Sequence, residues 1–126
     1  MARRHRLHTT KGNNRVWALD TAADRMHVLY DASASTAASL TGVDNVMVSN
    51  TGQLCVAEDG GDMQVCAVDA TGATAPLLQV VGHDRSELTG LAFSPDGTRL
   101  CVSSQRGATG TDSGGVTFEV TGLFAG

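Results

Sequence analysis

At three places in the 126-residue sequence, oxygen-bearing side chains that could bind a metal ion stand next to an apolar run. Asp44 and Asn45 directly precede the run VMVS, Glu58 and Asp59 directly follow LCVA, and Glu87 directly precedes LTGLAFS. Carboxylate and amide oxygens are the ligands that Ca²⁺, Mg²⁺ and Mn²⁺ prefer in proteins. Asp and Asn also cap turns by accepting hydrogen bonds from the nearby backbone. The residue types alone therefore do not distinguish a metal site from ordinary turn caps.

The elements that must position these side chains are short β-strands. Nine runs alternate in polarity or are rich in β-branched residues, and turn signals such as NTG, ATG and SPDG separate them. The 15 glycines and the low share of charged residues (17%) disfavour a helical bundle. The alanine-rich run 32–40 lacks a helical apolar stripe, so we predict a loop there and an all-β protein overall. The predicted strands are 15–20, 25–31, 45–49, 53–58, 63–69, 75–81, 88–94, 98–104 and 115–122.

An internal repeat gives these strands a common period. VMVSNTGQLCV aligns with LAFSPDGTRLCV, and the turn glycines Gly52 and Gly97 of the two copies lie 45 residues apart. RVWALD aligns with MQVCAVD, which places Asp20 and Asp69 49 residues apart. A period of this length that holds about four short strands is typical of β-propeller blades. In such blades the acidic positions described above meet on one rim.

The repeat predicts about two and a half four-stranded blades, at about 15–31, 42–81 and 88–122. A basic stretch (1–14), expected to be disordered, precedes them, and a short tail (123–126) follows. Propellers generally use four to eight blades to close the ring and cover the strand edges. We therefore expect either a fragment of a longer propeller or a chain that associates with copies of itself through open blade edges.

The charge distribution limits the class of partner. The net charge is −4, but the first fifteen residues contain five of the nine basic ones, so the rest of the chain is clearly acidic. An acidic body disfavours nucleic-acid binding. Two adjacent arginines, Arg3 and Arg4, invite comparison with a twin-arginine export signal, but no apolar segment follows them. We expect no signal peptide and no membrane span, and a cytoplasmic location if the chain is made as it stands.

The three cysteines offer no metal site of their own. Cys55, Cys66 and Cys101 lie inside the apolar runs LCVAE, VCAVD and LCVSS and show no zinc-site spacing. We expect them to pack in the core as small hydrophobic residues. The sequence also lacks a GxSxG elbow, a P-loop and an HExxH motif, so no common catalytic motif identifies a reaction.

Three runs of the sequence carry a family resemblance: TTKGNNRVWALD, GVDNVMVSNTGQLCVAEDGG and SELTGLAFSPDGTRLCVSSQRG. Together they resemble the C-terminal part of the PhoX-type alkaline phosphatase family, over about residues 9–122. The most specific elements are GVDN, AEDGG and SELTGLAFSPDG, in that order. The resemblance implies an exported, six-bladed β-propeller that hydrolyses small phosphate monoesters with a cluster of Fe³⁺ and Ca²⁺ in the channel mouth.

The resemblance also implies roles for the acidic residues. Asp44 and Glu87 match positions that are metal ligands in the family, and Glu58 matches the first acidic residue of its ED pair. Asn45 and Asp59 are weaker candidates, Asn45 as a group that orients a ligand. The family's cysteine iron ligand and phosphate-binding arginine have no counterpart in this sequence. We therefore expect a C-terminal fragment with an incomplete site that is inactive alone; the alternative is a non-catalytic propeller module that binds protein partners.

Overall fold

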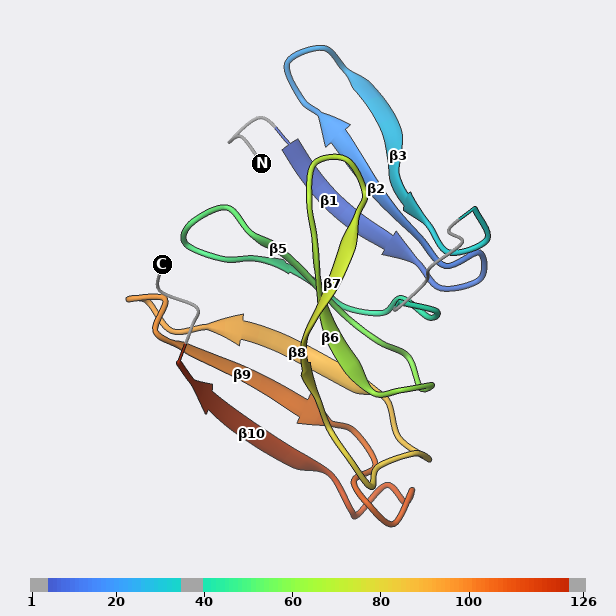
Figure 1. Cartoon of the computed structure of the whole chain (residues 1–126), viewed down its shortest axis with the longest axis vertical. Coiled ribbons are helices and arrows are strands. Elements are labelled where there is room, and N and C mark those ends of the chain that lie inside the picture. Colours follow the sequence, from blue (N-terminus) through green and yellow to red (C-terminus); the bar gives the residue numbers. More distant parts are fainter. Residues whose placement is uncertain (1–4, 35–39, 123–126) are drawn as a thin grey trace.

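The fold consists of strands and turns in the part of the chain that the computed structural model describes, residues 5–34 and 40–122 (Figure 1). Each of the nine predicted runs overlaps one strand, which confirms the all-β class. No helix in these ranges is long and apolar enough to cross a membrane. The predicted tail, the first four residues and most of the predicted loop (35–39) lie outside the described residues. The strands of the described ranges are β1 (His5–Thr10), β2 (Arg15–Asp20), β3 (Arg25–Asp31), β4 (Val46–Val48), β5 (Leu54–Ala57), β6 (Gln64–Val68), β7 (Thr74–Gln79), β8 (Leu88–Phe93), β9 (Arg99–Ser104) and β10 (Val116–Thr121).

The strands form three antiparallel sheets, each following the order of the chain. The first contains β1, β2 and β3, the second contains β4 to β7, and the third contains β8, β9 and β10. Figure 1 shows the four-stranded sheet between the other two. Every pairing joins strands that are neighbours in the sequence, as in β-hairpins. Most of the connections are short turns, but a longer loop (105–115) joins β9 to β10.

Strand β1 corrects the prediction of a disordered stretch (1–14) for the part that the structure describes, residues 5–14. Residues 5–10 pair with β2 along their whole length. Side chains alternate between the two faces of a strand, so Arg6 is exposed while Leu7 packs against the core. The basic residues obscure this two-residue alternation in the sequence, which is why the strand was not predicted.

Two hydrophobic clusters cover the two faces of the middle sheet and join it to the sheets on either side. Along β5, Leu54 and Val56 face the first cluster, whereas Cys55 and Ala57 face the second. This division arises because successive side chains of a strand point to opposite faces. Cys55 and Cys66 are buried in the core, as predicted, whereas Cys101 on β9 is only half-buried. Burial raises the pKa of the Cys55 thiol to about 11.

The ends of four strands meet at one end of the sheets, which we call the rim. The Asp44 N–H, just before β4, donates to the Ala57 carbonyl at the end of β5 (3.0 Å). The Leu88 N–H, at the start of β8, donates to the Glu58 carbonyl (3.0 Å). The Thr9 hydroxyl, near the end of β1, donates to the Asp44 carbonyl. Segments far apart in the sequence are therefore held side by side at the rim.

The turn between β8 and β9 depends on Asp96. Its Oδ1 accepts hydrogen bonds from the Ser94 hydroxyl (2.6 Å) and from the Thr98 hydroxyl and backbone N–H (2.8 and 3.1 Å). These bonds lower the pKa of Asp96 to about 2. Gly97 follows with a φ of +75°, a left-handed conformation that glycine adopts at little cost.

We expect Asp96→Asn to be less stable than wild type at pH 7 and less sensitive to acid. Because the pKa is lowered in the folded state, the charged form stabilises the fold above about pH 4, and this stabilisation is lost as the pH falls towards about 2. Thermal unfolding between these pH values measures the effect, with Asp112→Asn, at an exposed loop position, as the control. A difference between wild type and Asp96→Asn that stays constant with pH would contradict the assignment.

Candidate metal centre

Three carboxylates from three separate segments meet at the rim. Asp44 lies just before β4, Asp59 just after β5 and Glu87 just before β8. One carboxylate oxygen from each residue lies within 4.8 Å of the corresponding oxygens of the other two. Ca²⁺ binds oxygens at about 2.3–2.6 Å, so oxygens on opposite sides of the ion are about 5 Å apart. The three carboxylates, called the acidic cluster below, are close enough to bind one such ion.

Lys11 lies among these carboxylates. It follows β1 in the turn to β2, and its Nζ is 3.1 Å from an oxygen of Glu87, 3.1 Å from Asp59 and 3.5 Å from Asp44. The hydrogen bonds to Glu87 and Asp59 raise the pKa of Lys11, so the ammonium is charged at neutral pH. Sequence reasoning missed this residue, because Lys11 falls in the stretch that was expected to be disordered.

A second cation, Arg106, reaches the cluster from the loop after β9. Its Nη1 lies 3.6 Å from Glu87 Oε1. Its Nε donates to the Arg85 carbonyl (3.0 Å), and its backbone N–H donates to the Ser86 hydroxyl (2.8 Å). These bonds hold the guanidinium beside the cluster. Nothing in the surrounding run SSQRG marks this arginine as a site residue.

Asp59 and Glu87 titrate as a pair. The hydrogen bond between their side chains raises the pKa of Glu87 and lowers the pKa of Asp59. Burial adds to the increase for Glu87, whereas Lys11 lowers the pKa of both groups. The first proton that the pair takes up as the pH falls is therefore held by Glu87. Binding of a cation would compete with that proton.

Glu58 is next to Asp59 in the sequence but lies outside the acidic cluster. Its side chain is fully buried, and its two oxygens accept hydrogen bonds from the Thr41 N–H (3.2 Å) and the Gln64 N–H (2.9 Å). Burial raises the pKa of this carboxyl. Adjacent residues at the end of a strand point in opposite directions, so one of the pair faces the cluster and the other faces the interior. The structure thus brings Asp59, the weaker sequence candidate, to the site.

Asn45 supports the acidic cluster without joining it. Its Nδ2 donates to Thr89 Oγ1 (2.9 Å), and its Oδ1 accepts a hydrogen bond from the Gly90 N–H (3.2 Å). Both partners belong to β8, so the amide ties the chain next to Asp44 to the strand that follows Glu87. These are the contacts of a residue that positions its neighbours.

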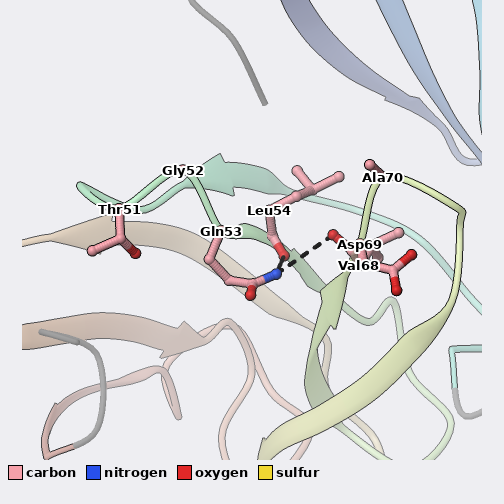
Figure 2. A pocket seen from close by; sticks show the side chains of 7 residues that line it. All are labelled: Thr51, Gly52, Gln53, Leu54, Val68, Asp69 and Ala70. Carbon is pink, nitrogen blue, oxygen red and sulfur yellow. Dashed lines mark hydrogen bonds between the residues drawn. The ribbon is translucent and has the colours of Figure 1, made fainter.

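A separate hollow lies between the β4–β5 and β6–β7 turns, at the other end of the middle sheet (Figure 2). Gln53 Nε2 donates to the carbonyls of Leu54 (3.2 Å) and Val68 (3.5 Å). Asp69 Oδ1 accepts hydrogen bonds from the N–H and hydroxyl of Thr71 in its own turn (2.8 and 2.6 Å). These polar groups stabilise the two turns through hydrogen bonds, and none of the acidic cluster's carboxylates lines the hollow.

The fold and the acidic cluster define an all-β protein with a site suited to a hard cation. The chain matches the family model of alkaline phosphatase PhoX over residues 4–107, a range that includes the acidic cluster, Lys11 and Arg106. The chain therefore belongs to the PhoX alkaline phosphatase family, which confirms the resemblance seen in the sequence. Comparisons with curated proteins and with solved structures find no match.

Proposed function

We propose that the chain forms part of a metal-dependent phosphatase site that hydrolyses phosphate monoesters, with Asp44, Asp59 and Glu87 as ligands of Ca²⁺. Family membership supports a phosphatase-type hydrolase. The observation that carries the metal assignment is the convergence of three carboxylates from three segments, with their oxygens within 4.8 Å of one another.

The residues of the acidic cluster fit Ca²⁺. Their donor atoms are carboxylate oxygens, which suit hard cations. Among the described residues no cysteine joins the cluster, and Cys55 and Cys66 are buried in the core. We therefore assign Ca²⁺ to the acidic cluster and assign no ligand set in this chain to the Fe³⁺ that the family resemblance implies.

The cluster supplies only part of a calcium site. Ca²⁺ takes six to eight oxygen ligands, so three carboxylates that each offer one oxygen leave several positions to water or substrate. Bound Ca²⁺ would stabilise the negative charge of a phosphoryl group. Arg106 lies beside the cluster and presents a fork of donors that suits a phosphate oxygen. With so few ligands, the chain alone binds Ca²⁺ weakly and has little hydrolytic activity.

The three sheets are consecutive propeller blades in this proposal. β1 contacts β4, and β5 contacts β8, so the relation between the first and second sheets recurs between the second and third. In this alignment the strands of the first sheet (β1–β3) take the positions that β5–β7 have in the middle sheet. The strands of the third sheet (β8–β10) take the positions of β4–β6. The outer edge of β10 and the open edge of β1 would each accept a further strand, and these are the blade edges through which we propose self-association.

Two aspartate variants test the proposed site. Asp59→Asn removes a carboxylate of the acidic cluster, whereas Asp62→Asn removes the same charge from the same loop, three residues later. We expect calorimetric titration of wild type to give a Kd for Ca²⁺ on the order of 1 mM. Asp59→Asn should bind at least about tenfold more weakly, and Asp62→Asn should bind within about twofold of wild type. If wild type binds Ca²⁺ and the two variants bind it equally well, the cluster is not the calcium site.

Hydrolysis of p-nitrophenyl phosphate in the same samples tests the phosphatase assignment. Any hydrolysis by wild type should require Ca²⁺ and should fall in Asp59→Asn as Ca²⁺ binding falls. Hydrolysis that persists without Ca²⁺ and is unchanged in Asp59→Asn would place the activity elsewhere.

A further inference from the structure

Lys11 is the only lysine in the chain, and its ammonium lies inside the acidic cluster. Nζ lies within 3.5 Å of a carboxylate oxygen of all three cluster residues. Arg106 approaches differently, because it contacts Glu87 through the other carboxylate oxygen, Oε1, at 3.6 Å. The two cations therefore occupy different places, and Lys11 holds the central one.

The ammonium and a metal ion would compete for this central place. The carboxylates that contact Nζ at 3.1–3.5 Å are those of the proposed calcium ligands. An ion bound at about 2.3–2.6 Å from the same carboxylates would overlap the volume of Nζ, which lies only slightly farther from them. Two positive charges at such a separation also repel each other strongly. Both cannot hold the position together.

We propose that Lys11 is an internal counter-ion that fills the cation position in the metal-free protein and withdraws when Ca²⁺ binds. This inference rests on the proposed function, because it takes the acidic cluster as the calcium site. Lys11 then has two effects. It relieves the mutual repulsion of the three carboxylates in the absence of metal, and it raises the Ca²⁺ concentration that is needed to load the site.

The surroundings of Lys11 allow this movement. Its side chain is 49% exposed, and a Cβ added at the next residue, Gly12, would meet nothing within 4 Å. A lysine ammonium is a compact charge on a flexible four-carbon stem, whereas the planar fork of arginine holds carboxylates in a fixed geometry. The withdrawn ammonium stays at the rim, where it adds to the attraction for an anionic phosphate ester.

The experiment compares the full chain as wild type, Lys11→Met and Arg6→Met. Lys11→Met removes the ammonium and keeps a long, flexible side chain, whereas Arg6→Met removes one positive charge at an exposed position of the same strand-and-turn segment. We expect calorimetry to show that Lys11→Met binds Ca²⁺ at least about tenfold more tightly than wild type, and that Arg6→Met stays within about threefold. Without Ca²⁺, Lys11→Met should have a lower Tm than wild type, and added Ca²⁺ should restore it.

A second measurement observes Lys11 directly. Reductive methylation with ¹³C-formaldehyde labels the amine of Lys11 and the N-terminal amine, because the chain has a single lysine. The dimethyl-lysine NMR signal of wild type should shift as Ca²⁺ saturates the protein.

The outcomes separate this inference from the proposed function. If wild type binds Ca²⁺, but Lys11→Met binds no more tightly and the lysine signal does not move, then Lys11 is not a competing counter-ion and the calcium site stands. If neither wild type nor Lys11→Met binds Ca²⁺, the proposed function fails and this inference fails with it.

Discussion

Glu58→Ala is expected to lower the free energy of unfolding by about 3 kcal/mol. The Thr41 and Gln64 N–H groups, both partly buried, lose the oxygens that accept from them at 3.2 and 2.9 Å. An unsatisfied buried donor costs about 1–3 kcal/mol, and the cost is lower where water reaches the group. Removal of a fully buried side chain also leaves a cavity. Burial raises the pKa of the Glu58 carboxyl, so relief of the cost of burying this charge offsets part of the loss.

Urea unfolding followed by the fluorescence of the single tryptophan, Trp17, measures this change. Glu58→Gln keeps one acceptor and should lose about half as much stability. Glu119→Ala is the surface control, since Glu119 is 55% exposed and lies 3.9 Å from Arg99, and it should change stability by less than about 0.5 kcal/mol. If Glu58→Ala were as stable as wild type but did not bind Ca²⁺, Glu58 would act as a metal ligand and not as a buried acceptor.

Glu87→Gln is expected to weaken Ca²⁺ binding by about 30- to 100-fold, more than Asp59→Asn does. Glu87 is 13% exposed and contacts both cations of the site, Lys11 at 3.1 Å and Arg106 at 3.6 Å. Neutralising it removes one ligand and leaves two positive groups beside two carboxylates. The ion therefore loses an attraction and meets a more positive site, a combined loss of about 2–3 kcal/mol.

Calorimetric titration of wild type, Glu87→Gln and Glu119→Gln measures this effect. Glu119→Gln removes the same charge from an exposed position on β10 and should bind Ca²⁺ as wild type does. The metal-free Tm of Glu87→Gln should change little, because the amide oxygen of glutamine still accepts a hydrogen bond from Lys11. Calcium affinity within about twofold of wild type in Glu87→Gln would remove Glu87 from the ligand set.

The strands could be predicted from the sequence because their signals are local. Alternation of polarity and turn residues are encoded within a few neighbouring positions. The β8–β9 turn is an example, since Asp96 takes its partners Ser94 and Thr98 from its own turn. β1 is the exception. Arg6 and His8 make its alternation resemble a charged tail, and only the pairing with β2 shows that it is a strand.

The acidic cluster could be predicted only in part. Asp44 and Glu87 are conspicuous because each lies just ahead of a predicted strand. The choice between Glu58 and Asp59 depends on the direction that each side chain takes at the end of β5. The sequence does not contain that information, because the partners that hold Glu58 in the interior come from other segments, such as the N–H of Thr41.

By itself, the sequence determined the all-β class, the place of most strands and the family, because these depend on local patterns and on motifs that can be read in order. Only the tertiary structure decided that Asp59 joins the cluster and that Lys11, 76 positions from Glu87, lies at its centre. The packing of sheets sets such long-range contacts, and a single charged side chain carries no periodic signal of its distant partner. The charge balance of the site, and with it the expected response to Ca²⁺, is therefore a property of the fold.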